Sequence, residues 1–284
     1  MIFNVIKDIQ LDHVATAVEN WEDAWPTVVG VLGGKWKSGG FNLGFAPAQL
    51  SFANDMRIEV LMPSDVEHND FLRRFLDHSG PGPHHLTFKV HDIEAALDEV
   101  RSAGFEPTGV SIGNPWWKEA FIHPKQALGV VVQIAQSAGS WFVPPPKGVP
   151  MPKEGVNSEL LWVGHAVSDI NRGLELFRDL LGGTELASGS CDDGSSNWIE
   201  LSWKGPGRIR LIAKNPDSEV KSPVEDWLKG RSGRICHLAF GVQDLQSSEG
   251  LHESGLPGMP DGAQVLGVSE ALNLPVIIVR AKGN

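Results

Sequence analysis

Residues 83–93 read Pro83-His84-His85-Leu86-Thr87-Phe88-Lys89-Val90-His91-Asp92-Ile93. The alternation of polar and apolar residues predicts a β-strand, because successive side chains of a strand point to opposite faces. His85, Thr87 and Lys89 share one face, whereas the Leu, Phe and Val between and after them share the other. We therefore expect the apolar face to pack in the core and the polar face to line a solvent-accessible space.

The start of this strand recurs along the chain. In four places a first residue is followed by Val at five residues, by Asp or Asn at seven and by an apolar residue at eight. The four first residues are His13, His85, Trp162 and His237. The third start is Trp162 rather than His165, because only Trp162 has the Val and the Asp at these spacings. His165 is then expected on the opposite face of its strand, in a structural role.

Each start is followed by a helical run and then by short strands. The clearest helix is predicted at residues 94–101, where Asp92 is a good N-cap and Gly104 ends the run. The other helical runs begin at Trp21 and cover 171–181 and 245–253, and strands are expected at 41–45, 56–62, 130–135, 209–213 and 276–279. A strand, a helix and several strands, repeated four times, predict an α+β fold of four βαβββ modules that pair into two domains.

Prolines mark a boundary between the second and third modules. Residues 137–157 contain Pro144-Pro145-Pro146, Pro150 and Pro152, and such a composition is typical of a stiff connector. We expect a first domain at residues 1–136, a linker at 137–157 and a second domain at 158–284.

Composition narrows the class of partner. The chain has 284 residues and a net charge of −11, and an acidic surface repels phosphate backbones, so nucleic acid is not an expected partner. Two cysteines without a CxxC spacing fit a reducing compartment. The sequence has no recognisable signal peptide and no apolar run near the roughly 20 residues of a membrane span. We expect a cytoplasmic protein that acts on a small molecule without a membrane partner.

Four polar residues fall at corresponding positions of the first two modules. Glu59 and Gln133 each interrupt an apolar strand, where a polar group needs a partner or a ligand. If the modules pair about a local two-fold axis, these two converge with His13 and His85. Two imidazoles, a carboxylate and an amide oxygen predict a divalent-metal site. The alternative is that each histidine is only a structural residue.

These stretches resemble the vicinal oxygen chelate superfamily, which includes glyoxalase I, extradiol dioxygenases and methylmalonyl-CoA epimerase. Residues 9–136 are most similar to the epimerase branch. The matching stretches are Asp12-His13-Val14-Ala15, Ile58-Glu59-Val60-Leu61-Met62-Pro63, His84-His85-Leu86, and His123-Pro124-Lys125 followed by Gly129-Val130-Val131-Val132. The resemblance implies two glyoxalase-like domains, with a bound Zn, Co, Ni, Mn or Fe ion that chelates two substrate oxygens. By this resemblance, the residues that correspond to the metal ligands of the family are His13, Glu59, His85 and Gln133.

Two departures from the family pattern affect the expected chemistry. The last ligand of the family is usually Glu and here is Gln133, and the other catalytic carboxylate of the epimerase falls on Asn42. Neither amide can act as a base. The remaining candidates for proton transfer, and so the predicted catalytic residues, are Glu59, His84, Lys89 and His123.

The second half lacks the ligand set. Its corresponding positions are predicted to be Trp162, Arg210, His237 and Val279, which cannot hold a divalent cation in the same way. We therefore expect a degenerate glyoxalase-like domain at residues 158–284.

Three functions remain in competition. The first is a metal-dependent isomerase or lyase that binds a carbonyl or thioester compound and stabilises an enolate-like intermediate. The second is an iron-dependent ring-cleaving dioxygenase of the extradiol type, against which the vacant second half and the complete absence of Tyr count. The third is a non-catalytic protein that binds small molecules. A homodimer is an open option for each.

Overall fold

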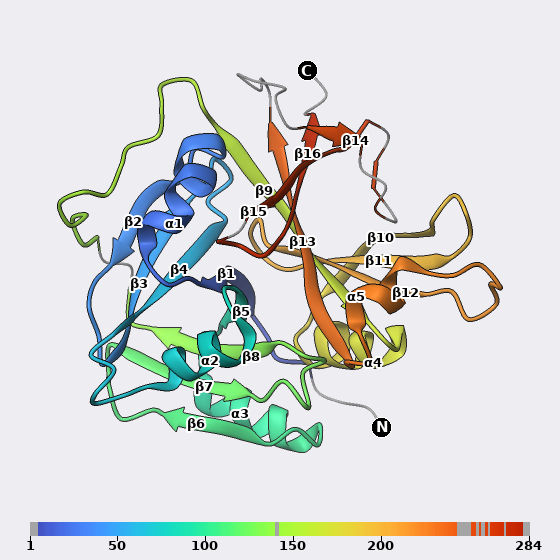
Figure 1. Ribbon diagram of the computed structural model, residues 1–284. Helices are drawn as coiled ribbons and strands as arrows, with labels where there is room; N and C mark the ends of the chain where they lie inside the picture. Colours follow the sequence, from blue (N-terminus) through green and yellow to red (C-terminus); the bar gives the residue numbers. More distant parts are fainter. Residues whose placement is uncertain are drawn as a thin grey trace.

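In the part of the chain that the structure describes, two mixed sheets of eight strands each form the framework (Figure 1). The structure is a computed structural model, and it describes residues 5–139, 142–242, 251–253, 256, 259–260, 262–269 and 271–280. The strands of the first sheet are β1 (Gln10–Ala17), β2 (Lys35–Gly39), β3 (Gly44–Ser51), β4 (Arg57–Ser64), β5 (Gly82–Lys89), β6 (Pro107–Ser111), β7 (Trp117–Ile122) and β8 (Val131–Ser137).

The second sheet repeats the first. Its strands are β9 (Ser158–Val167), β10 (Thr184–Ser190), β11 (Ser196–Ser202), β12 (Arg208–Lys214), β13 (Gly233–Val242), β14 (His252–Glu253), β15 (Gln264–Ser269) and β16 (Leu274–Arg280). The orders are β2-β3-β4-β1-β5-β8-β7-β6 and β10-β11-β12-β9-β13-β16-β15-β14. In each sheet the two central strands pair antiparallel, and each of them pairs parallel with the last strand of its own module. The predicted fold, in which four modules pair two by two into two sheets, is therefore confirmed.

The helices are short. They are α1 (Trp21–Trp25), α2 (Phe71–Ser79), α3 (Ile93–Ser102), α4 (Ile170–Leu174) and α5 (Pro223–Leu228), with π-helical continuations η1 (Pro26–Val31) after α1 and η2 (Glu175–Leu180) after α4. The helix predicted at 94–101 is confirmed, and the Asp92 side chain accepts hydrogen bonds from the backbone N–H groups of Glu94 and Ala95. This cap satisfies two of the donors that a helix leaves unpaired at its first turn.

Two local predictions differ from the structure. The strand expected at 41–45 begins only at Gly44, because 41–43 form the turn between β2 and β3. Of the helix expected at 245–253, residues 245–250 lie outside the described part, and His252–Glu253 form strand β14. Among the described residues, no helix is long and apolar enough to cross a membrane.

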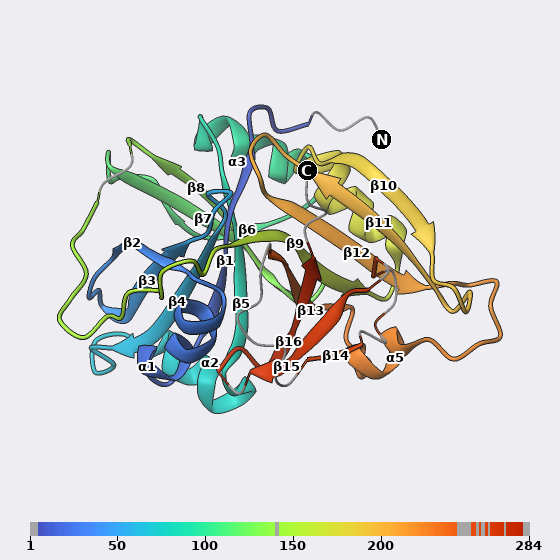
Figure 2. The ribbon, with the colours of Figure 1, turned by 90° about the horizontal axis from the view of Figure 1, so that it is seen from above.

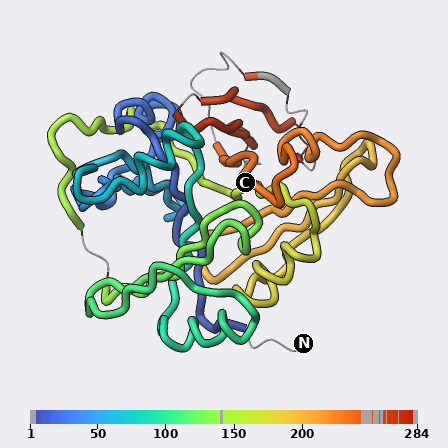
Figure 3. Tube along the Cα trace, turned by 60° about the horizontal axis from the view of Figure 1, so that its bottom comes forward, coloured from blue at the N-terminus to red at the C-terminus, as the bar shows by residue number. Residues whose placement is uncertain are grey.

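A continuous apolar core joins the two halves of the chain. Phe88 of β5 packs its ring against Phe177 of η2 and against Trp203, with ring centroids 6.3 and 5.2 Å apart. Residues 142–157, which lead into β9, follow the outer side of the first sheet near β2, as Figures 1 and 2 agree. The indole N–H of Trp36 in β2 donates to the Val143 carbonyl and so ties this segment to the sheet. Figure 3 shows the two halves side by side, with the second half in yellow to red.

Candidate metal centre

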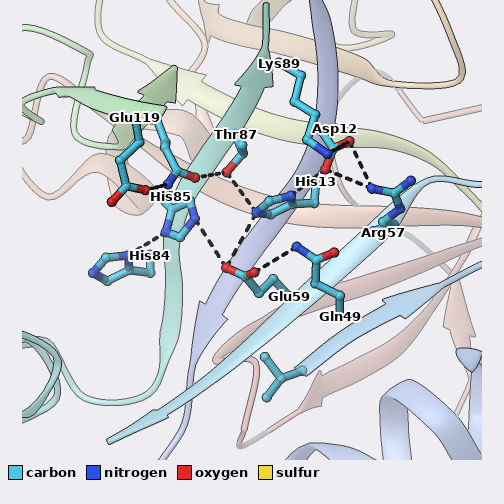
Figure 4. A network of polar contacts seen from close by, with 12 residues as sticks. Asp12, His13, Gln49, Arg57, Glu59, His84, His85, Thr87, Lys89 and Glu119 are labelled. Atoms are coloured by element: carbon cyan, nitrogen blue, oxygen red, sulfur yellow. Dashed lines mark hydrogen bonds and ion pairs between the residues drawn. The ribbon is translucent and has the colours of Figure 1, made fainter. Parts of the chain in front are cut away.

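Three adjacent strands of the first sheet bring His13, Glu59 and His85 together (Figure 4). They lie on β1, β4 and β5, and in the strand pairing Ala15 of β1 faces both Glu59 and His85. Glu59 Oε2 lies 3.5 Å from His13 Nε2 and 3.6 Å from His85 Nε2. One potential ligand atom from each of the three buried side chains lies within 4.8 Å of the other two.

The hydrogen bonding of His85 indicates whether the three side chains fit a metal ion. Its Nε2 is buried and has no hydrogen-bond partner among the described residues. A buried polar atom without a partner costs free energy, and a metal ion would satisfy it. Two imidazoles and one carboxylate are a donor set that suits Zn²⁺, Fe²⁺ and related ions. The residues present therefore fit a divalent metal.

Asp12 holds the imidazole of His13. Asp12 Oδ2 lies 2.8 Å from His13 Nδ1, and Asp12 also pairs with Arg57 at 3.0 Å and with Lys89 at 3.3 Å. A carboxylate on one ring nitrogen directs the other nitrogen toward Glu59, an arrangement that is common in metal-binding histidines. Burial alone would lower the pKa of His13, but the neighbouring Glu59 and Asp12 carboxylates outweigh it and raise this pKa to about 9.

Glu59 stays ionised in this setting. Burial favours its neutral form, but the nearby His13 and His85 and a hydrogen bond from Gln49 lower the pKa of Glu59 to about 2. Gln49 Nε2 donates to Glu59 Oε1 at 2.9 Å, so this oxygen is held while Oε2 faces the two imidazoles.

Gln133 reaches the cluster through Thr87. The Thr87 hydroxyl lies 2.6 Å from Gln133 Oε1 and 2.8 Å from His13 Nε2, and both Thr87 and Gln133 are buried. The other end of the Gln133 amide donates from Nε2 to Glu119 Oε2 at 2.7 Å. The predicted fourth ligand is thus linked to His13 through the Thr87 hydroxyl, with its oxygen on the Thr87 side of the amide.

His84 supports His85. Their Nδ1 atoms are 2.8 Å apart, and the His84 ring packs edge-on against Phe71 and Phe75 of α2. If His85 is to bind a metal through Nε2, its Nδ1 must carry the proton and donate it to His84. Burial lowers the pKa of His84 to about 4 and, together with His84, holds the pKa of His85 well below its usual range, so both rings are neutral at pH 7.

An open pocket of about 690 Å³ lies over the cluster. His84 and Lys89, predicted from the sequence as candidates for proton transfer, line it, and so do Asn42 and Glu119. His123 does not reach it. This residue lies in the exposed turn after β7, where its Nδ1 accepts the backbone N–H of Lys125, so the structure does not bring it to the candidate site.

The corresponding position of the second half is filled by side chains. The Arg210 guanidinium lies 3.8 Å from the ring centroid of Trp162 and pairs with Glu200 at 2.6 Å. The Trp162 indole N–H donates to His237 Nε2 at 2.9 Å, which occupies the atom that a metal would need. Burial and then Arg210 lower the pKa of His237 to about 3.

One predicted correspondence in the second half was wrong. Gln133 pairs with Thr87 in the first sheet, and the equivalent pair in the second is Ile277 with Ala239. Ile277 rather than Val279 therefore stands at the Gln133 position. His165 lies on the opposite face, as predicted, and its Nε2 is 3.0 Å from the Leu128 carbonyl of the first half.

Sequence reasoning missed Glu119 and left Thr87 without a role. Trp117, Glu119 and Phe121 share one face of β7, and all three line the pocket. A carboxylate between two aromatic residues on one strand face is a signal of the kind that singled out Glu59 on β4, and the same test would have found Glu119.

Comparison with known proteins agrees with this fold. Residues 12–121 match the family model of the glyoxalase/bleomycin resistance protein/dioxygenase superfamily. A mutant 4-hydroxymandelate synthase from Streptomyces coelicolor is similar over 97% of this chain and 94% of its own, with 13% identity and a TM-score of 0.67. A search of curated protein sequences finds no significant match.

Shorter solved structures match about half of the chain. A hypothetical protein from Bacillus halodurans C-125 is 28% identical over 48% of this chain and 100% of its own, with a TM-score of 0.43. Methylmalonyl-CoA epimerase from Mycobacterium tuberculosis is 28% identical over 49% of this chain and 94% of its own, with a TM-score of 0.42. Residues 12–121 thus match the model of the glyoxalase/bleomycin resistance protein/dioxygenase superfamily, and the chain as a whole shares the fold of 4-hydroxymandelate synthase.

Proposed function

We propose that this protein is a metal-dependent isomerase or lyase that binds a carbonyl or thioester compound through two oxygens. The observation that supports this most is the orphaned Nε2 of His85 beside His13 and Glu59, beneath an open pocket. His13, Glu59, His85 and Gln133 would hold the ion. A divalent ion bound there would supply a Lewis acid that polarises a carbonyl oxygen and stabilises enolate-like charge.

The surrounding residues prepare the ligands for this role. Asp12 and His84 each bind the ring nitrogen that faces away from the cluster, and Gln49 holds the second oxygen of Glu59. Ligands fixed in this way lose little conformational freedom when the ion binds.

Proton transfer needs a group outside the ligand set. Glu59 is held by two imidazoles and Gln49, and Lys89 is paired with Asp12, so neither is well placed to exchange protons with a substrate. The acidic and imidazole side chains that line the pocket outside the ligand set are His84 and Glu119. We propose that one of these two moves the proton at the substrate carbon.

Metal analysis tests the proposal first. Protein stripped with a chelator and reconstituted with Zn²⁺, Co²⁺, Ni²⁺, Mn²⁺ or Fe²⁺ should bind one ion per chain. His85→Ala should lose the ion, whereas His237→Ala should retain it, because His237 Nε2 already accepts a hydrogen bond from Trp162. A wild-type protein that binds none of these ions, or equal loss in both variants, would sink the assignment.

Isotope exchange then tests the chemistry. With a redox-inert ion bound, deuterium from D₂O should enter the carbon beside the carbonyl in at least one of a panel of thioesters and ketones. We expect one of the two variants His84→Asn and Glu119→Gln to lose this exchange and the other to keep it. The residue whose replacement abolishes the exchange is the proton-transfer residue.

A ring-cleaving dioxygenase is the second candidate. It is favoured by one observation, the set of two histidines and one carboxylate, which also suits Fe²⁺ and oxygen. Tight Fe²⁺ binding with oxygen uptake in the presence of a catechol would support this candidate against the isomerase.

A further inference from the structure

Glu119 lies beside the ligand cluster without belonging to it. Its Oε2 accepts two hydrogen bonds, one from Gln133 Nε2 at 2.7 Å and one from the Trp117 indole N–H at 2.8 Å. Trp117 and Glu119 lie two residues apart on β7, so they share a strand face. The indole therefore anchors the carboxylate in the position where it meets Gln133.

This contact fixes which end of the Gln133 amide faces the cluster. The two ends of an amide are nearly equal in shape and opposite in polarity, and only the oxygen can bind a metal ion. A carboxylate accepts hydrogen bonds and cannot donate them, so Glu119 binds the nitrogen end. The oxygen end is left to accept from Thr87, whose hydroxyl also lies 2.8 Å from His13 Nε2.

We propose that Glu119 is a positioning residue that makes Gln133 the fourth ligand of a divalent cation. The inference rests on the proposed metal site and extends it to the residue that selects the amide orientation. It also explains why residue 133 is an amide. A carboxylate at residue 133 would lie about as close to the Glu119 carboxylate as Gln133 Nε2 does, at 2.7 Å, and the two negative charges would repel each other.

Titration of the metal-free protein with Co²⁺ tests this role. Glu119→Leu removes the acceptor and should weaken Co²⁺ binding about 10- to 100-fold, the usual effect of losing such a supporting partner. Glu119→Gln is the matched control, because its side-chain oxygen can still accept from Gln133 and Trp117. It should stay within a few-fold of the wild type, and the visible spectrum of bound Co²⁺ should be unchanged.

A double-mutant cycle separates this role from a general structural one. If Glu119 acts through Gln133, Glu119→Leu should add nothing to the loss already caused by Gln133→Leu. The Co²⁺ spectra of the two single variants should then be alike and differ from that of the wild type. If Glu119→Leu does not fold, Glu119→Ala removes the same acceptor without adding volume and is judged by the same outcomes.

Two results would overturn the inference while leaving the proposed function standing. One is wild-type affinity and spectrum in the leucine variant, and the other is a full additive loss when both residues are replaced. A wild-type protein that does not bind Co²⁺ or any other divalent ion would overturn both.

Discussion

The proton on His13 should compete with the metal. With Asp12 on one side and Glu59 on the other, the pKa of His13 is raised to about 9, so at pH 7 the metal-free ring is charged. Binding through Nε2 must release this proton, whereas His85, whose pKa is lowered well below its usual range, has none to release. Affinity for Co²⁺ should therefore rise about tenfold for each pH unit between roughly 6.5 and 8.5 and level off near pH 9.

Calorimetry in buffers of different ionisation enthalpy measures this release directly. We expect close to one proton per metal ion at pH 7. Metal binding that is independent of pH and releases no proton would show that His13 Nε2 is not a ligand.

Gln133→Glu should create a pair of carboxylates that share a proton. Gln133 Nε2 lies 2.7 Å from Glu119 Oε2, and two like charges at this distance raise the pKa of the pair above its unfolded value. A raised pKa stabilises the fold at low pH and costs stability as pH rises. The variant should match the metal-free wild type near pH 4 and be less stable by about 1–3 kcal/mol at pH 7.

Thermal melts of chelator-treated protein between pH 4 and 8 measure the difference. The double variant Gln133→Glu with Glu119→Gln restores one amide and one carboxylate and should regain most of the loss. A stability difference that does not change with pH would contradict the shared proton.

The convergence of the three residues of the candidate site could be predicted from strand alternation together with a two-fold pairing of the modules. Strand alternation placed His13, Glu59 and His85 on inward faces, and the structure brings them together. Contacts that depend on the order of strands in the sheet could not be predicted from the alternation of residues along one strand. Glu119 meets Gln133 because β7 pairs with β8, and nothing in the spacing of the two residues reveals that pairing.

At the level of secondary structure, the sequence predicted where the helix of each of the first three modules begins, but it did not predict local irregularities within the helices. Asp92 caps α3 as its position before the apolar run predicted. By contrast, two of the predicted helices change into π-helices after a single turn, at Pro26 and at Glu175. Wider turns of this kind depend on how the helix packs on the sheet, which propensity does not encode.

Asp92→Ala tests the best-defined helix start. Its side chain accepts two backbone N–H groups, and the loss of such a cap costs about 1 kcal/mol of unfolding free energy. Asp98→Ala is a matched control on the same helix, because Asp98 is exposed and pairs with Arg101, a contact worth a few tenths of a kcal/mol. Urea unfolding of the two variants measures the difference. Equal losses would mean that the cap adds nothing.

Across the whole molecule, the two halves share one strand arrangement but place side chains of opposite charge at the equivalent central position, Glu59 in the first half and Arg210 in the second. Gln49 faces Glu59 in the first sheet, and Glu200 faces Arg210 at the equivalent pair of the second. In the first half, Glu59 faces the imidazoles of His13 and His85, and His85 Nε2 has no hydrogen-bond partner among the described residues. In the second half the guanidinium lies near Trp162 and Trp198 and pairs with Glu200, so the protein closes its own site. The same fold thus provides one open centre and one closed one.

The contact between the halves depends on a close approach of two backbones. Gly129 has φ +78°, and a Cβ there would lie 1.8 Å from the Gly233 carbonyl oxygen at the start of β13. Just before it, the Leu128 carbonyl faces His165 Nε2 of the second half at 3.0 Å. Gly129→Ala must therefore push the halves apart at this point, and we expect it to lower the unfolding free energy by about 3 kcal/mol or more.

Gly104→Ala isolates the backbone part of this effect. Gly104 has a similar φ of +83°, but a Cβ there meets no heavy atom within 4 Å. It should cost about 1 kcal/mol, the usual penalty for an alanine in the left-handed region. Chemical denaturation of both variants gives the two values, and their difference measures the contact between the halves. Equal values would mean that the second half can move away at no cost, and the shared core would then contribute little to holding the domains together.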